Sequence, residues 1–116
     1  MFSLNSSLTY YLYRESADMR KGFDSLSGLV QTELQGNPHS GEVFVFVNKR
    51  RDCMKLLRWE PNGFILYHKR LERGTFSMPL KAESISSNEI RWPDLVMMIE
   101  GISFDYIRRR KRFSVG

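Results

Sequence analysis

The N-terminal third of the chain shows a strand-like pattern followed by a helix-like one. Residues 8–14 are rich in aromatic and β-favouring side chains, which predicts a first strand. Apolar residues then recur at spacings of four, three, four and four, at Met19, Phe23, Leu26, Val30 and Leu34. This spacing lines one face of a helix, and the breakers Gly36-Asn37-Pro38 place its end before residue 36.

The middle of the chain has the pattern of consecutive strands. The expected elements are a strand at 43–47, a polar turn at 48–52, a strand at 53–59, a strand at 64–71 and a short strand at 76–78. The first of these is continuously apolar, so we expect it to be covered on both faces at the centre of the sheet. Pro61-Asn62-Gly63 offers the fixed φ and the positive φ that a tight reversal needs. These strands are expected to form an antiparallel meander.

The C-terminal third predicts a connection, a second helix and a basic tail. Residues 81–91 are serine-rich and weakly patterned, so we interpret them as a connection. Pro93 suits the first helical position and Gly101 suits a helix end. The apolar face between them consists of Leu95, Val96, Met98 and Ile99. Five consecutive cations at 108–112 repel one another, which predicts a segment that resists folding until a partner neutralises it.

These elements predict a single α+β domain over residues 1–107 and a basic C-terminal tail over residues 108–116. The sheet is expected to be mainly antiparallel, with four to five strands and two helices. A chain of 116 residues suits one compact core, and 41% hydrophobic and 27% charged residues are ordinary for a globular protein.

Cysteine content and hydropathy indicate the compartment. Cys53 has no partner cysteine, so no internal disulfide forms, which fits a reducing environment. The chain shows no secretory signal, and its apolar runs are far shorter than the roughly 20 residues that span a bilayer. We therefore expect a soluble, cytoplasmic protein that does not act at a membrane.

Positive charge is concentrated in two parts of the chain. The 18 basic and 13 acidic residues give a net charge of +5. Residues 108–112 hold five cations, so residues 1–107 balance to zero, and residues 43–73 carry eight cations against three carboxylates. A basic block and a basic tail are what a polyanion-binding surface needs, because neutralised phosphates release counterions. The alternative interpretation is a solvated surface that keeps the protein soluble.

These cations are the candidate nucleic-acid-binding residues: Arg20, Lys21, Lys49, Arg50, Arg51, Lys55, Arg58, Lys69, Arg70, Arg73, Arg108, Arg109, Arg110, Lys111 and Arg112. Trp59, Phe64, Tyr67 and Phe76 alternate with the cations of the meander, as stacking and backbone contact with nucleic acid require. A sheet core with a basic rim has a similar pattern. We interpret Phe44 and Phe64 as core residues and leave both roles open for Trp59 and Tyr67.

The segment 18–24, DMRKGFD, has two interpretations. If the first helix begins near Asp18, then Arg20 and Lys21 lie in its first turn, where cations are unfavourable unless they bind an anion with the free N–H groups. If the helix begins near Asp24, residues 18–22 form a polar turn with a flexible glycine. The spacing alone favours neither.

Patterns for catalysis, metals and cofactors are missing from the sequence. His39 and His68 have no ligand partner at metal-binding spacing, and no nucleophile elbow or phosphate-binding glycine loop occurs. Acidic residues such as Asp18 and Asp52 are far more typical of caps, turns and ion pairs than of a two-metal nuclease. We therefore expect no enzyme and no cofactor, with a small nuclease as the least favoured alternative.

Three blocks of sequence carry a resemblance to a known family. They are residues 18–26 (DMRKGFDSL), residues 44–76 with FVF, KLLRW and YHKRLERGTF in order, and residues 97–102 (MMIEGI). The chain thereby resembles the small TnpB-type (Orf2-like) accessory proteins of IS66-class insertion sequences, which are distinct from the larger RNA-guided nucleases that share the TnpB name. The resemblance implies an accessory role in transposition without catalytic residues, because strand cutting belongs to a separate transposase.

The chain departs from the family pattern in two places. Trp92 stands where the family has a threonine before the helix proline, so the second helix is expected to begin differently or to be less stable. The basic tail extends beyond the matching blocks, so its role is inferred from charge alone.

Two hypotheses for the mechanism follow. In the first, the cations hold the DNA of the element's ends by its backbone and help assemble the transposase complex. In the second, the protein is an adaptor that binds the transposase of the same element, or another copy of itself, through apolar residues around Leu95, Met98 and Ile99, without a direct role for DNA.

Overall fold

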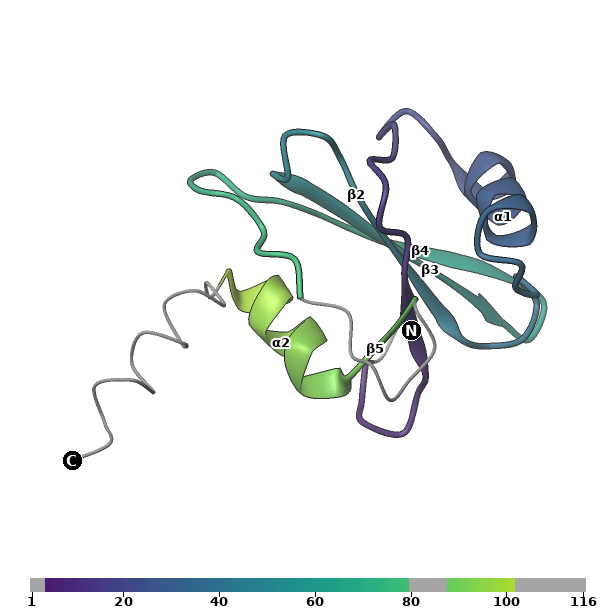
Figure 1. Ribbon diagram of the computed structural model, residues 1–116. Coiled ribbons are helices and arrows are strands. Elements are labelled where there is room, and N and C mark those ends of the chain that lie inside the picture. Colours follow the sequence, from purple (N-terminus) through teal and green to yellow (C-terminus); the bar gives the residue numbers. More distant parts are fainter. Residues whose placement is uncertain (1–3, 80–87, 102–116) are drawn as a thin grey trace.

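A five-stranded sheet with a helix on each face forms the fold (Figure 1). The structure is a computed structural model that describes residues 4–79 and 88–101. The elements are β1 (Tyr10–Leu12), α1 (Phe23–Thr32), β2 (Val43–Val47), β3 (Cys53–Glu60), β4 (Gly63–Arg70), β5 (Glu89–Ile90) and α2 (Trp92–Glu100). The strand order is β4-β3-β2-β1-β5, and every pair is antiparallel except β1 with β2. The mainly antiparallel α+β fold and its meander are thus confirmed.

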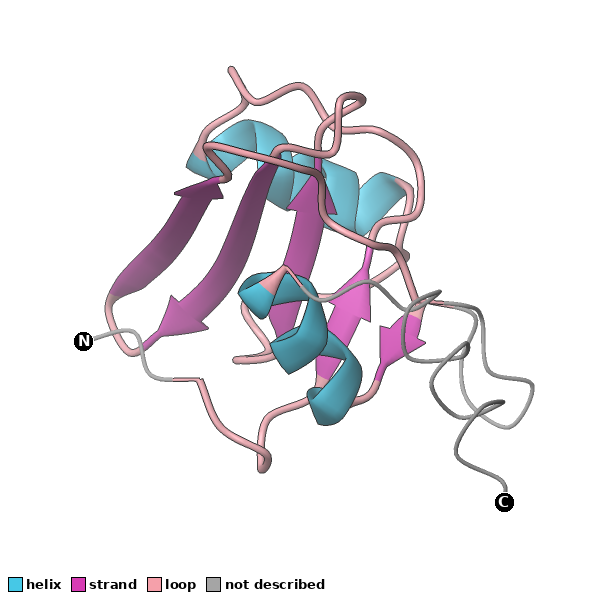
Figure 2. Ribbon diagram, turned by 90° about the vertical axis from the view of Figure 1, so that its left-hand side faces the viewer, coloured by secondary structure: helices cyan, strands magenta, loops and turns pink. Residues whose placement is uncertain are grey.

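The central strand β2 is buried on both faces, as its continuous apolar pattern predicts. Val43, Val45 and Val47 belong to the cluster that also holds the α2 residues Leu95 and Met98. Phe44 and Phe46 belong to the opposite cluster, which includes the α1 residues Leu26 and Val30. Because successive side chains in a strand point to opposite faces, one strand supplies both core layers. Figure 2 shows the two helices on opposite faces of the sheet.

The β3–β4 hairpin has the tight reversal expected from its sequence. Glu60 pairs with Gly63, so the connection consists of Pro61 and Asn62. Asn62 has a φ of 84°, a left-handed conformation that asparagine tolerates better than most residues. The pairing then continues without interruption to Cys53 and Arg70.

Helix α1 begins at Phe23 rather than at Asp18. Residues 18–21 form a turn in which the Lys21 N–H donates to the Asp18 carbonyl at 3.0 Å. Gly22 then adopts an extended conformation as the N-cap residue, and the helix buries Leu26 and Val30. The placement of Arg20 and Lys21 in the first helical turn is therefore wrong, and the polar-turn interpretation is correct.

Two short segments differ from the sequence prediction. Residues 76–78 do not form a strand: Phe76 is buried, and its N–H donates to the Arg51 carbonyl at 2.6 Å. The region interpreted as a connection contains the two-residue strand β5, which pairs with Tyr10 and Tyr11 of β1. Residues 81–87 of that predicted connection lie outside the described part of the chain.

Helix α2 ends at Gly101 as predicted, with a φ of 76°. It begins at Trp92, and its N-cap residue Arg91 makes no side-chain cap hydrogen bond. The Trp92 ring instead stacks on Tyr10, with ring centroids 5.6 Å apart. Leu95 and Met98 are fully buried against the sheet, so the suggestion that these two residues face a protein partner is wrong.

Across the described ranges 4–79 and 88–101, neither helix is long and apolar enough to cross a membrane.

Candidate nucleic-acid interface

The turn between β2 and β3 presents three consecutive cations in a fixed conformation. The side chains of Lys49, Arg50 and Arg51 are exposed. Asn48 holds the turn, because its Oδ1 accepts from the N–H groups of Asp52 and Cys53 at 3.0 Å each. Its Nδ2 also donates to Asp52 Oδ1 at 2.7 Å. The side chain of one asparagine therefore fixes the backbone that carries the three cations.

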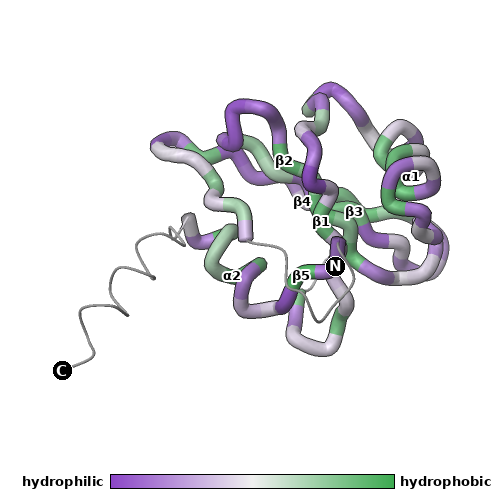
Figure 3. The backbone as a smooth tube through the Cα atoms, in the orientation of Figure 1, coloured by the Kyte–Doolittle hydropathy of each residue, from purple (hydrophilic) through white to green (hydrophobic). Residues whose placement is uncertain are grey.

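A second segment, the loop after β4, is bound to this turn. The Leu71 N–H donates to the Asp52 carbonyl at 2.7 Å, and the Phe76 N–H donates to the Arg51 carbonyl at 2.6 Å. These bonds hold the loop after β4 beside the turn, at the same end of the sheet (Figure 1). The end of β4 and this loop add two further exposed cations. We call this set the basic end, and it consists of Lys49, Arg50, Arg51, Arg70 and Arg73. Figure 3 shows the turn after β2 as strongly hydrophilic.

The cations of the basic end are only weakly neutralised by neighbouring carboxylates. Within residues 4–79 and 88–101, its one ion pair joins Arg70 to Glu72 at 3.6 Å, and both side chains are more than two-thirds exposed. Such a pair contributes little stability and leaves both groups open to other ions. The Asp52 carboxylate has a lowered pKa, mainly because Asn48 donates a hydrogen bond to it. The surface therefore keeps an excess of positive charge.

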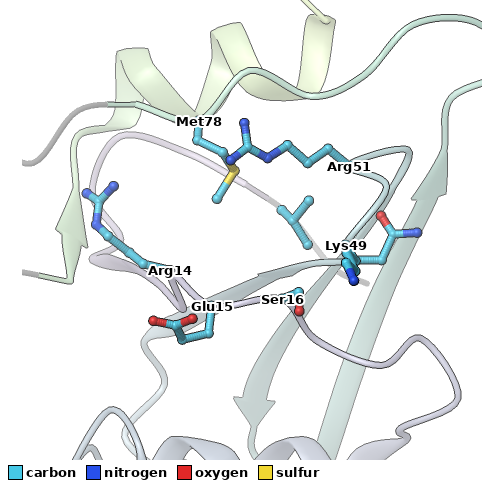
Figure 4. Close-up of a pocket in the computed structure, with 8 residues that line it drawn as sticks. Arg14, Glu15, Ser16, Lys49, Arg51 and Met78 are labelled. Carbon is cyan, nitrogen blue, oxygen red and sulfur yellow. The ribbon is translucent and has the colours of Figure 1, made fainter.

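Arg14 joins this region although sequence reasoning omitted it. Strands β1 and β2 are parallel, so the residues that follow them meet at the same end of the sheet. A cavity of about 200 Å³ lies there, and its lining includes Arg14, Lys49, Arg51 and the carboxylate of Glu15 (Figure 4). The Arg14 Nη1 donates to the Pro79 carbonyl at 2.7 Å, and burial lowers the pKa of this guanidinium. Arg14 could be placed here only if the parallel pairing of β1 and β2 were known, and the apolar pattern of the sequence does not reveal that pairing.

Arg20 and Lys21 lie on the α1 side of this end of the sheet. Their segment is attached to the end of β2, because the Ala17 N–H donates to the Val47 carbonyl at 2.9 Å. Arg20 forms an ion pair with Asp18 at 2.7 Å. Hydrogen bonds from Arg20 lower the pKa of Asp18 to about 2. The Arg20 guanidinium is 91% exposed but already has a carboxylate partner.

Three of the cations predicted to bind nucleic acid instead donate hydrogen bonds to backbone carbonyls of the protein. Lys55 is only 7% exposed, and its Nζ donates to the carbonyls of Met19 and Lys21 at 2.7 and 2.8 Å. Lys69 Nζ donates to the Ile99 carbonyl at 2.6 Å, where a cation suits the C-terminal turn of α2. Arg58 lies at the opposite end of the sheet and bonds Gly41. The tail cations Arg108, Arg109, Arg110, Lys111 and Arg112 lie outside the described residues.

The aromatic residues of the meander do not present exposed rings among the cations, because Phe76, which lies beside Arg51, has a buried side chain. Trp59 and Phe64 pair next to the β3–β4 turn, and their rings meet edge to face with centroids 4.9 Å apart. His39 packs against both rings. Tyr67 is half-buried and packs on the core cluster under α2. The basic end therefore groups exposed cations without exposed aromatic rings for stacking.

Groups suited to metal binding do not assemble in the described part of the chain, where no three histidine, cysteine or acidic residues gather. His68 is mostly exposed, but the protein around its ring removes some of the water, and this desolvation together with the charges of Lys55 and Arg70 lowers its pKa. Burial also raises the pKa of the Cys53 thiol, which disfavours the reactive thiolate.

Comparison with known proteins gives one family and two relatives. Residues 8–109 match the family described as IS66 Orf2 like protein. The chain is 34% identical over 79 residues to the uncharacterized protein y4jC of Sinorhizobium fredii (strain NBRC 101917 / NGR234), an alignment that covers 68% of each chain. It is 42% identical over 62 residues to the uncharacterized protein y4hO of the same organism, which covers 53% of this chain and 54% of that protein. No solved structure matches the chain.

Proposed function

The chain belongs to the IS66 Orf2-like family, an accessory family of insertion sequences, and on this premise we propose that it binds duplex DNA through the basic end during transposition. The observation that carries the proposal is the gathering of five exposed cations on two segments joined by backbone hydrogen bonds. A fixed group of cations neutralises several phosphates at once, and the release of their counterions drives association.

The contacts that we propose are made to the sugar-phosphate backbone. Exposed arginine and lysine side chains on turns suit phosphate oxygens, and such contacts position a protein on DNA without reading bases. Trp59 and Phe64, which have the rings for stacking, lie away from the basic end. In this proposal the selection of the element's ends falls to the transposase, which also performs the strand cutting.

A salt titration of DNA affinity tests the role of the basic end. Each phosphate contact contributes about 0.9 to the slope of log affinity against log salt for duplex DNA. The variant Arg50→Ala is compared with Arg91→Ala, because both remove one exposed positive charge and Arg91 lies at the opposite end of the sheet. Arg50→Ala is expected to lower the slope by about 0.9, and the triple variant Lys49→Ala/Arg50→Ala/Arg73→Ala by about 2.7.

The same titration gives two outcomes that contradict the proposal. If Arg91→Ala changes the slope as much as Arg50→Ala does, binding follows net charge rather than the basic end. If neither single variant nor the triple variant changes the slope, the basic end does not contact DNA. Circular dichroism of each variant checks that the fold is retained.

We also propose that DNA bridges this protein to the transposase. Co-purification of the two proteins, with and without nuclease, distinguishes this arrangement from a direct adaptor. The proposal expects the association to be lost after nuclease digestion. Association that persists without DNA supports an adaptor surface instead, and that surface would have to exclude the buried Leu95 and Met98.

A further inference from the structure

The two edge strands of the sheet differ in length, a feature that plays no part in the proposed function. Strand β5 forms one edge with two residues, whereas β4 forms the other with eight. Among the described residues, β4 pairs only with β3, and Figure 2 shows β4 as the outermost strand on the left. A very short edge strand offers few pairing groups, but an eight-residue edge is a template for another strand.

The hairpin fixes which backbone groups of β4 face the open edge. A two-residue connection closes on a hydrogen-bonded pair, here Glu60 with Gly63, and bonded pairs then alternate along the ladder. The bond from the Leu71 N–H to the Asp52 carbonyl continues the same alternation. The outward backbone groups are therefore those of Phe64, Leu66, His68 and Arg70.

Within the described residues, this edge lacks most of the features by which sheets avoid pairing. It contains no proline, and its register with β3 is continuous, so no bulge turns it away. Phe64, Ile65, Leu66 and Tyr67 are consecutive, apolar and half-buried. Ile65 belongs to neither core cluster nor to the residues packed against them. Histidine and basic side chains occupy only the last three positions of the strand, His68 to Arg70.

We propose that a second copy of this chain pairs with β4 along this edge, antiparallel, around a twofold axis at Leu66. In this register Phe64 of one copy lies opposite His68 of the other, so outward backbone groups meet outward groups and each face of the sheet continues across the interface. The inference is independent of the proposed function, because it rests on backbone pairing and not on DNA.

The charge distribution along β4 favours an antiparallel second copy. The strand ends at Lys69 and Arg70 next to the basic end. The opposite end of the sheet, which we call the hairpin end because it holds the β3–β4 turn, has Glu42 and an ion pair between Glu60 and Arg58 at 3.5 Å. Parallel pairing would place two basic ends side by side, which like-charge repulsion disfavours. Antiparallel pairing sets each basic end against the partner's hairpin end and closes a dimer with twofold symmetry.

Analytical sedimentation of the full chain tests the dimer. The protein is first treated with nuclease and then measured at about 0.3 M salt, which screens long-range repulsion. The expected result is a reversible dimer of the 13.7 kDa chain. His68→Pro removes an outward N–H without removing a β3–β4 bond and is expected to weaken dimerisation by about tenfold or more. His68→Ala keeps the N–H and is the matched control, with dimerisation close to that of the natural chain.

Amide hydrogen exchange of the unmodified chain decides the question even if His68→Pro does not fold. The inference expects the outward amides of Phe64, Leu66 and His68 to become protected as protein concentration rises, while those of Ile65 and Tyr67 are protected at every concentration. A chain that stays monomeric overturns the inference. A dimer whose outward amides exchange freely, or one weakened equally by His68→Pro and His68→Ala, also overturns it.

Discussion

The buried ammonium group of Lys55 attaches the segment before α1 to the sheet. Lys55 lies on β3 opposite Phe46 and His68, and its side chain reaches the carbonyls of Met19 and Lys21. A charge at 7% exposure requires such partners, because an unpaired buried charge is strongly unfavourable. The two hydrogen bonds hold residues 19–21 in a turn, so that α1 begins only at Phe23.

Replacing Lys55 is expected to destabilise the protein. Lys55→Met keeps most of the side-chain volume but leaves the two carbonyls without their donor, which costs about 1 to 3 kcal/mol. Chemical denaturation measures the loss in the free energy of unfolding, and faster amide exchange at Lys21 locates it. Arg91→Ala, at an exposed position without a cap bond, is the control and should change stability by less than about 0.5 kcal/mol. Unchanged stability of Lys55→Met would contradict this role.

Asp18 gives a prediction about pH. Hydrogen bonds from Arg20 lower its pKa from 3.8 to about 2 in the folded protein. A carboxyl group with a lowered folded-state pKa stabilises the fold above its unfolded pKa, and this contribution is lost as pH falls from about 4 to about 2. Arg20→Ala is expected to return the pKa of Asp18 towards 3.8, as measured by NMR titration of the carboxyl carbon. A pKa that stays near 2 in this variant would show that the Arg20 side chain is not the main cause.

At the scale of elements, the N-terminus of α2 lacks a side-chain cap, so a substitution there can stabilise the helix. Arg91 has the extended conformation of an N-cap residue, with φ −81° and ψ 150°, but no side-chain cap bond. Arg91→Ser places a hydroxyl within reach of the Asp94 N–H, so we expect a gain of about 0.5 to 1 kcal/mol in the free energy of unfolding. Thermal denaturation measures this gain, with Arg91→Ala as the comparison that removes the charge without adding a cap. Equal stability of the two variants would contradict the expectation.

The elements that sequence predicts well are those with long, one-sided or fully apolar patterns. Strand β2, the β3–β4 hairpin and the end of α2 at Gly101 follow from their own residues. Strand β5 has only two residues, too few to show a period. Phe76 is a residue type typical of strands, but its N–H bonds the Arg51 carbonyl, and this contact between distant parts of the chain cannot be seen in the sequence. The sequence does not decide where α1 begins, because Met19 and Phe23 continue the helical spacing of apolar residues. In the structure Met19 precedes the helix and Phe23 is exposed.

The candidate interface was predictable in its charge but not in its geometry. The sequence shows that residues 43–73 are basic. It does not show that Lys55 turns inward, because both faces of β3 contact a core layer and alternation alone cannot separate them. Nor does it show that Arg14 meets Lys49 and Arg51, which depends on parallel pairing between β1 and β2.

At the scale of the whole molecule, the two ends of the sheet differ in charge and chemistry. The basic end holds five exposed cations, whereas the hairpin end holds Trp59, Phe64 and Glu60. Lys69 bonds Ile99 and so attaches the end of α2 near the basic end.

Deleting the tail is expected to weaken DNA binding in a salt-dependent manner. If all five cations at 108–112 contact phosphates, removal of residues 108–116 lowers the slope of log affinity against log salt by up to about 4.5. Removal of residues 113–116 alone deletes no charged side chain and is the matched control. An unchanged slope after the longer deletion would exclude the tail from the interface.

The most direct test of the central claim is a residue-level map of the surface that contacts duplex DNA. Backbone amide chemical shifts of the full chain are followed by NMR as a duplex is added at fixed salt. The account predicts that the shifts that change are those of residues 48–52 and 70–76, while those around Gly41, Glu60 and Arg91 stay constant. Changes centred on the hairpin end, or spread evenly over the whole surface, would contradict it.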